Sequence, residues 1–280
     1  MQFVLTRDVA EFAAHADGLF ARRLDCNILA TVTMNARDGA FPGTAPLFAY
    51  GVDDDGAVQF AALRVPPWPW LVCGLEAGLA DELVGLWLDV DPDVPGVSGP
   101  PEAVRAIAAA WTRRTAGETR RSMEEAMHVL EAALDPPHPA RGDLRRAQPA
   151  ERPLLVVWMA AFAREAGVGG ADRAEVIVDG WLRRGGLWIW DDAGAVSLLG
   201  TTRPVAGVVR IGPVYTPPEH RGRGYAGSAV AAASRRALAH GANRCMLFTD
   251  LANPTSNKIY AEVGFRRVGD WEEHTFERGR

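Results

Sequence analysis

The chain has 280 residues, 48% of them hydrophobic, which is enough for two domains that each bury a core. Its formal net charge of −5 argues against nucleic acid as the main partner, because nucleic-acid-binding domains present basic surfaces. No apolar run is long enough to span a membrane, and the N-terminal stretch, with charge in its first eight residues, does not resemble a signal peptide.

The number and spacing of the cysteines indicate the redox environment of the protein. Cys26, Cys73 and Cys245 stand at spacings that predict neither a metal site nor a disulfide. An odd and sparse cysteine count is typical of a reducing environment. We therefore expect a cytoplasmic protein without a metal.

The first part of the chain mixes helical and extended patterns. Apolar residues recur at helical spacing over 9–20, and β-rich composition predicts a strand at 27–34. The patterns then predict a hairpin of 48–52 and 58–63, an irregular Pro-Trp connection at 65–70, a helix at 79–87, a short strand at 94–97 and a helix from Pro101. Residues 123–134 fit a strand or a helix equally well.

The second part begins after a stiff, proline-rich stretch at 135–142, which we interpret as a linker. The patterns then predict a strand at 143–148, helices at 155–162 and 174–182, a hairpin of 187–190 and 195–201, a strand at 205–214, a helix at 226–239, a strand at 244–249, a short helix at 256–263 and a final hairpin at 265–276.

A Gly-rich turn lies between the strand at 205–214 and the helix at 226–239. Gly222 and Gly224 allow a tight turn, and Arg221 and Arg223 add positive charge. The first N–H groups of a helix lack intrahelical partners and lie at the positive end of its dipole. Such turns also occur for packing reasons, but this one is suited to bind a phosphate or pyrophosphate.

Two residue strings in this part resemble motifs of the GCN5-related N-acetyltransferases (GNAT). Arg221-x-x-Gly224-x-Ala226 is similar to the acyl-CoA signature of that family. The string NPTSNKIY at 253–260, followed by Gly264-Phe265, is similar to its second motif. The resemblance covers roughly residues 142–277 and follows the family's order and spacing.

The resemblance implies an α/β (α+β) fold, with a mixed central sheet flanked by helices, and a catalytic domain at 142–280. Residues 1–135 repeat the coarse order of elements, so we hypothesise a tandem protein whose first domain is a degenerate copy. Where the Gly-rich turn is expected, this copy has VPPWPWLVCGLEAG and no signature. A non-homologous cap domain is the alternative.

The resemblance also implies acetyl-CoA as co-substrate, with backbone N–H groups of the turn facing its pyrophosphate. In the family, the end of the preceding strand pairs with the pantetheine arm like an added strand, and Gly212-Pro213 is expected to separate that strand from its neighbour. The implied cofactor-binding residues are Val214, Tyr215, Thr216, Arg221, Gly222, Arg223, Gly224, Tyr225, Ala226, Gly227, Ser228 and Asn253. Asn253 fits a helix cap equally well.

Tyr260 is the candidate catalytic acid, and the alternative is an aromatic residue that only packs on a short helix. A phenol has a pKa near ~10 and a thiol near ~8.5, so a hydrogen-bonded tyrosine is a reasonable proton donor to the leaving thiolate. The base is unassigned, because Phe248 occupies the position five residues before Asn253 where several relatives have glutamate. Asp250 reads best as a turn residue, and Glu165, Asp172 and Glu219 are not ranked by the sequence.

These features predict an N-acetyltransferase that moves an acetyl group directly from acetyl-CoA to a primary amine. The acceptor is expected to be a small molecule or a peptide, with no nucleic-acid or membrane partner, and the protein to be a monomer or homodimer. The alternative is a catalytically silent CoA-binding sensor or scaffold. Serine-hydrolase, zinc-protease and P-loop motifs are absent from the sequence.

Overall fold

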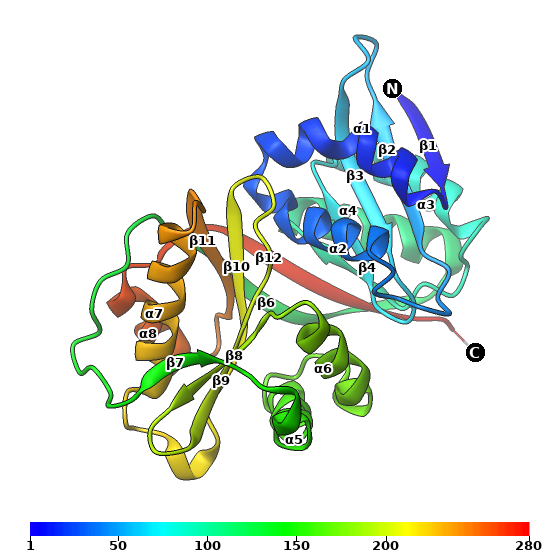
Figure 1. Cartoon of the computed structure of the whole chain (residues 1–280). Helices are drawn as coiled ribbons and strands as arrows, with labels where there is room; N and C mark the ends of the chain where they lie inside the picture. The colour runs from blue at the N-terminus through cyan, green and yellow to red at the C-terminus, as the bar shows by residue number, and fades with distance from the viewer. Residues whose placement is uncertain (280) are drawn as a thin grey trace. The chain divides into compact units, whose positions relative to one another are not determined.

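The computed structural model describes residues 1–279, which form two compact units (Figure 1). Unit 1 comprises Met1–Glu125 and the C-terminal stretch from Gly269, and unit 2 comprises Ala126–Val268. These units differ from the predicted bounds of 1–135 and 142–280 because the C-terminal strand pairs with a strand of unit 1, with Glu272 opposite Gly99.

Unit 1 combines a mixed sheet with helices. Its elements are β1 (Gln2–Thr6), α1 (Val9–Arg22), η1 (Leu24–Cys26), α2 (Asn27–Arg37), β2 (Leu47–Val52), β3 (Val58–Arg64), β4 (Trp70–Cys73), η2 (Ala77–Leu79), α3 (Ala80–Leu88), β5 (Gly96–Gly99), α4 (Pro101–Thr115), the first part of β6 (Glu118–Leu130) and the last part of β12 (Arg266–Glu277). Strands β1 to β4 are antiparallel, whereas β4 and β5 are parallel.

Alternate residues of the unit 1 strands face opposite sides of the sheet, as the period of two requires. Phe60 and Trp70 join α3 and α4 in one core, whereas Phe48 stacks on Phe12 of α1 with ring centroids 4.8 Å apart. Trp70 also stacks on Trp87 of α3 at 4.2 Å, and both rings are fully buried.

We predict that Trp70→Ala lowers the free energy of unfolding by about 3–5 kcal/mol, because it removes a stacked, buried indole and leaves a cavity. Trp68→Ala is the matched control. The Trp68 side chain is only partly buried, and its contacts with Arg64 and Val65 use its backbone. Urea denaturation measures both variants, and equal losses would contradict this account of the core.

Two expectations for secondary structure were wrong, and two strands were not predicted. Residues 27–34 lie in helix α2 rather than a strand, because tertiary packing buries several residues of the helix, including Leu29, Thr31 and Thr33, and outweighs local β propensity. The hydroxyls of Thr31 and Thr33 donate to carbonyls four residues earlier at 2.8 Å, so they remain paired inside the core. The final hairpin is one strand, β12, which pairs along its length instead of turning back. Strands β1 and β4 were not predicted, and residues 123–130, which the sequence left open, belong to β6.

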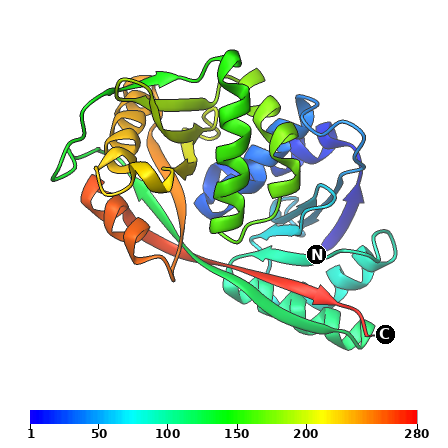
Figure 2. The ribbon, with the colours of Figure 1, turned by 90° about the horizontal axis from the view of Figure 1, so that it is seen from below.

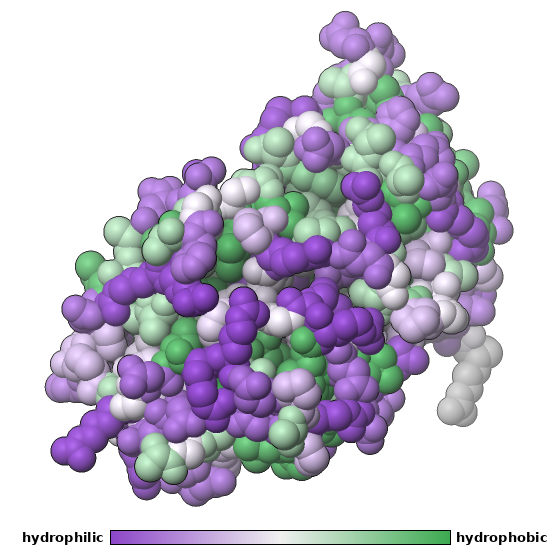
Figure 3. Space-filling view, viewed as in Figure 1, coloured by the Kyte–Doolittle hydropathy of each residue, from purple (hydrophilic) through white to green (hydrophobic). Residues whose placement is uncertain are grey.

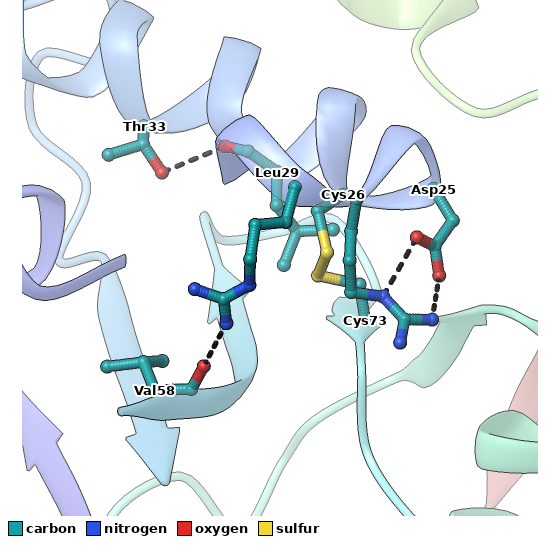
Figure 4. Close-up of a disulfide and its surroundings, with 8 residues drawn as sticks. Asp25, Cys26, Leu29, Thr33, Val58 and Cys73 are labelled. Carbon is teal, nitrogen blue, oxygen red and sulfur yellow. Dashed lines mark hydrogen bonds and ion pairs between the residues drawn. A yellow bond between two sulfur atoms is a disulfide. The ribbon is translucent and has the colours of Figure 1, made fainter. Parts of the chain in front are cut away.

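A disulfide also corrects the sequence analysis. Cys26, at the end of η1, is bonded to Cys73, at the end of β4, with their Cα atoms 5.4 Å apart (Figure 4). The two residues are 47 positions apart in the chain, so their spacing gave no sign of this contact. Cys245 is free and buried.

Unit 2 repeats the same order of elements. They are the rest of β6, β7 (Asp143–Arg146), η3 (Pro149–Glu151), α5 (Arg152–Glu165), η4 (Ala171–Arg173), α6 (Ala174–Arg183), β8 (Leu187–Asp191), β9 (Ala195–Thr201), β10 (Val208–Tyr215), η5 (Pro218–His220), α7 (Tyr225–Ala239), β11 (Arg244–Asp250), α8 (Pro254–Val263) and the start of β12. Each unit therefore runs strand, two helices, three strands, helix, strand, helix and strand. This repeat agrees with the tandem arrangement inferred from the coarse order of elements, although neither β1 nor α2 of unit 1 was predicted.

Helices cover both faces of the unit 2 sheet, with α7 and α8 on one face and α5 and α6 on the other (Figures 1 and 2). Trp188 and Trp190 of β8 pack in the core beside α7, whereas Leu187 and Ile189 pack in the core beside α5 and α6. This alternation confirms the predicted α/β fold with a mixed sheet flanked by helices.

On the surface, hydrophilic and hydrophobic side chains are interspersed over the face seen in Figure 3.

Candidate active site

The site predicted in unit 2 begins where two parallel strands separate. β10 pairs with β11 only from Val208 to Arg210, although both strands continue beyond this point. On its other edge β10 stays paired with β9, with a register shift between Ile211 and Val214. This irregularity lies at Gly212-Pro213, as predicted, and it leaves the end of β10 without a ladder partner in β11 among residues 1–279.

The end of β10 is fixed by side chains from neighbouring segments. The hydroxyl of Ser197 in β9 donates to the carbonyl of Tyr215 at 3.0 Å and lies 2.9 Å from the hydroxyl of Thr216. Arg221 donates from Nε to the carbonyl of Thr216 at 2.9 Å. Val214–Thr216 therefore has a defined extended edge before the prolines that follow.

The Gly-rich turn has the backbone that its glycines permit. Gly222 and Gly224 adopt φ of +75° and +78°, in the left-handed region that other residues rarely enter. Gly224 is the N-cap of α7, and no side chain within the described residues caps this helix end. Arg221, Gly222, Arg223 and Gly224 are exposed to solvent. The turn therefore presents uncapped N–H groups and two arginines, the features of an anion site.

The stretch 131–142, which precedes β7, packs against the start of α7. The backbone N–H of Ala140 donates to the Ser228 hydroxyl at 2.8 Å. A Cβ atom added to Gly224 would lie 2.7 Å from the carbonyl oxygen of His138, and one added to Gly227 would lie 3.6 Å from Pro136. Gly227 and Ser228 are buried, so among the predicted cofactor residues they face protein rather than open solvent.

Two side chains of the second motif connect β11 to α8. The Asn253 side chain accepts a hydrogen bond from the Ser256 backbone N–H at 3.1 Å, which is the helix-cap role. Asn257, which the sequence analysis did not single out, accepts from the Thr249 hydroxyl at 2.6 Å and donates to the Asp250 carbonyl at 3.1 Å. These bonds fix the end of β11, on the other side of the strand separation.

Tyr260 lies on α8 in the core that α7 and α8 share. Its side chain is 9% exposed and packs edge to face with Phe265, with ring centroids 6.1 Å apart. Burial raises the pKa of Tyr260 to about 12, because the phenolate would lose its hydration. Tyr260 is therefore protonated at any physiological pH and is a weaker acid than free tyrosine.

The carboxylates that the sequence left unranked lie in different settings. Asp250 accepts from the Ala252 N–H at 2.8 Å, as a turn aspartate does. Glu165, the last residue of α5, lies beside Arg221 and the end of β10. In the sequence Glu165 only follows the helical pattern predicted at 155–162, so the sequence could not have indicated these neighbours. Phe248 is on β11, as expected.

Unit 1 has a cavity of about 530 Å³ at the corresponding place in its order of elements, where β4 leads into α3. It is lined by residues 74–78, by Pro100, Glu102 and Ala103 at the start of α4, and by Arg23. Arg23 is paired with Asp25, and Glu76 and Glu102 add negative charge. This lining does not favour a diphosphate, in agreement with the missing signature.

Residues 1–279 contain no group of three His, Cys, Asp or Glu side chains that could hold a metal ion. They also contain no helix that is long and apolar enough to cross a membrane.

Comparison with known proteins agrees with this geometry. Residues 157–265 match the model of the acetyltransferase (GNAT) family, whereas no curated protein sequence matches the chain. Among solved structures, the fold resembles a tandem GNAT protein of the clavulanic acid biosynthesis pathway, with a TM-score of 0.60 and 16% identity over 100% of this chain and 99% of the other.

Two other solved structures have the same fold. A GCN5-related N-acetyltransferase from Sphaerobacter thermophilus has a TM-score of 0.58 and 16% identity over 99% of this chain and 95% of its own. A Drosophila protein has a TM-score of 0.67 and 13% identity over 96% of this chain and 95% of its own. At these identities the likeness concerns the fold alone.

Proposed function

We propose that the chain is an N-acetyltransferase that moves the acetyl group of acetyl-CoA directly to a primary amine, because residues 157–265 match the model of the acetyltransferase (GNAT) family. Catalysis is assigned to unit 2, within the predicted catalytic domain 142–280. Unit 1 is assigned the role of a degenerate copy that lacks the signature. The observation that carries the proposal is the uncapped Gly-rich turn beside the separated strands β10 and β11.

Acetyl-CoA fits this arrangement in two places. The diphosphate would accept hydrogen bonds from the N–H groups of the exposed turn residues 222–224 and of the uncapped start of α7. The pantetheine arm would pair with the free edge of Val214–Thr216 as an added strand. Backbone N–H groups at that edge would also polarise the thioester carbonyl, which becomes more negative as the amine attacks. The further assignment of Gly227, Ser228 and Asn253 to the cofactor belongs to the same proposal.

Tyr260 is proposed to assist the leaving group. The amine nitrogen attacks the thioester carbon, the C–S bond breaks, and the sulfur takes up a proton to leave as the CoA thiol. With a pKa of about 12 for Tyr260 and ~8.5 for a free thiol, complete proton transfer is uphill by roughly 5 kcal/mol. Tyr260 therefore acts chiefly as a hydrogen-bond donor to the developing thiolate. Loss of water around the bound thiolate raises the pKa of the thiol and so reduces the pKa difference from Tyr260.

The amine must lose a proton before or during attack. Phe248 cannot accept it, so we propose that the acceptor binds as the neutral amine or gives up its ammonium proton to water. Water also takes the further proton that the nitrogen releases as the amide forms, while the CoA sulfur takes up one proton. A catalytically silent CoA-binding sensor is the second candidate, and the absence of a carboxylate at Phe248 is the observation that favours it.

The proposed acceptor is a small-molecule or peptide amine, with a monomer or homodimer as the working form. The cysteines no longer support a cytoplasmic setting, because Cys26 and Cys73 form a disulfide. A panel of primary amines incubated with the protein and acetyl-CoA tests the activity, with free thiol and acetylated product measured together. We expect stoichiometric CoA thiol and N-acetyl product with at least one amine class. Acetyl-CoA binding without product from any amine would favour the sensor.

A further inference from the structure

The end of α5 meets the end of β10 and the start of the Gly-rich turn, which follow 50 and 56 residues later in the chain. Glu165 ends α5, Tyr215 ends β10 and Arg221 begins the turn. Both carboxylate oxygens of Glu165 accept hydrogen bonds from these neighbours. Oε1 accepts from the Tyr215 hydroxyl at 3.1 Å, and Oε2 accepts from Nη2 of Arg221.

Arg221 is held on two further sides. Its Nε donates to the Thr216 carbonyl at 2.9 Å, and its guanidinium carbon lies 5.8 Å from the centre of the Tyr215 ring. Glu165 and Arg221 are each about half exposed, at 46% and 47%, whereas Tyr215 is buried. The guanidinium therefore closes the stretch 216–221 into a loop whose two ends are bonded to each other.

This loop joins the two places that the proposed function assigns to acetyl-CoA, the strand edge and the turn. Oriented guanidinium–carboxylate contacts are stronger and more directional than neutral hydrogen bonds, so they fix geometry as well as charge. Because Arg221 already bonds a carboxylate, its fixed position matters more for the cofactor than its net charge does.

We propose that Glu165 is a positioning residue for the acyl-CoA site: it holds Arg221 and Tyr215 so that the end of β10 and the Gly-rich turn keep the conformation that binds the cofactor. The inference rests on the proposed function and extends it to a residue of α5. Loss of Glu165 should therefore weaken the binding of acetyl-CoA. If Glu165 only neutralised Arg221, its removal would free a positive charge and tighten the binding of an anionic cofactor.

The test is Glu165→Gln, which keeps the size of the side chain and removes its charge and one acceptor oxygen. Calorimetry at fixed salt concentration should show acetyl-CoA bound about tenfold more weakly than by the wild type, with little change in Tm. Glu175→Gln is the matched control. It disrupts another exposed Arg–Glu pair of unit 2, Glu175 with Arg152, and should leave the affinity unchanged.

Two further measurements keep the proposal testable. Tyr215→Phe removes only the phenol bond to Glu165 and should weaken binding in the same direction by a smaller factor. Hydrogen exchange of 212–224 without cofactor should be faster in Glu165→Gln than in the wild type and in Glu175→Gln. Unchanged or tighter binding in Glu165→Gln, or unchanged exchange, would overturn the positioning role. Absence of binding in the wild type would instead refute the proposed function, and the exchange measurement would still decide the role of Glu165.

Discussion

Replacing Gly222 with glutamate should reduce acetyl-CoA binding by more than about a hundredfold, whereas alanine at the same position should cost no more than about tenfold. Gly222 adopts φ of +75°, so both variants carry the same backbone strain, of order 1–2 kcal/mol. No atom lies within 4 Å of the position that an added Cβ would take, so both variants have room for the Cβ at this exposed position. Only glutamate places negative charge beside the proposed diphosphate.

Calorimetry with acetyl-CoA measures this pair of variants, and thermal unfolding checks that both are folded. Gly224 is a poorer position for the test, because a Cβ there would lie 2.7 Å from the His138 carbonyl and would disturb the packing of 131–142. Gly43→Glu in unit 1 is the control for charge, since Gly43 also has a positive φ of +73° and open space around it. Normal affinity in Gly222→Glu would place the diphosphate elsewhere.

Removing the Tyr260 hydroxyl should lower kcat about a hundredfold and leave the affinity for acetyl-CoA unchanged, because the phenol acts only on the departing sulfur. The measurement is the steady-state rate of thiol release by Tyr260→Phe, with a parallel binding titration. Tyr50→Phe, in unit 1, also removes a phenol with one hydrogen-bond partner, Glu11, and should keep the wild-type rate. A rate within twofold of the wild type in Tyr260→Phe would exclude the acid role.

The pH dependence of kcat gives a second readout of Tyr260. An acid works only while it is protonated, so activity is lost as pH rises through its pKa. Since burial raises the pKa of Tyr260 to about 12, no loss attributable to this residue should occur below about pH 10.5. A fall in rate between pH 8 and 10 that disappears in Tyr260→Phe would show that the phenol titrates there instead.

The sequence predicted most elements of unit 2 because its patterns are strong and local. Gly222 and Gly224 indicated the turn through their conformational freedom, and Gly212-Pro213 indicated the break in β10. In unit 1, a strand was wrongly predicted at 27–34 because the β-branched residues there favour strands. In the structure Thr31 and Thr33 are buried by tertiary packing in a helix, and their hydroxyls bond its backbone. Local propensity cannot register such packing.

Local sequence patterns could not predict contacts between segments that are distant in the chain. Glu165 and Arg221 are far apart in the chain, as are Cys26 and Cys73, and only the fold brings each pair together. The pairing of β12 with β5 is a contact of the same kind, and it changes which residues form each compact unit. The motif strings located the turn and Tyr260, whereas the side chains that support the turn required the structure.

Titration of the wild-type protein with acetyl-CoA by calorimetry tests the central claim most directly. The proposal predicts saturable binding of one acetyl-CoA per chain, because only unit 2 carries the signature and the uncapped Gly-rich turn. Absence of binding would contradict the assignment of unit 2 as an acyl-CoA site, and a stoichiometry of two would contradict the assignment of unit 1 as a copy that no longer binds the cofactor.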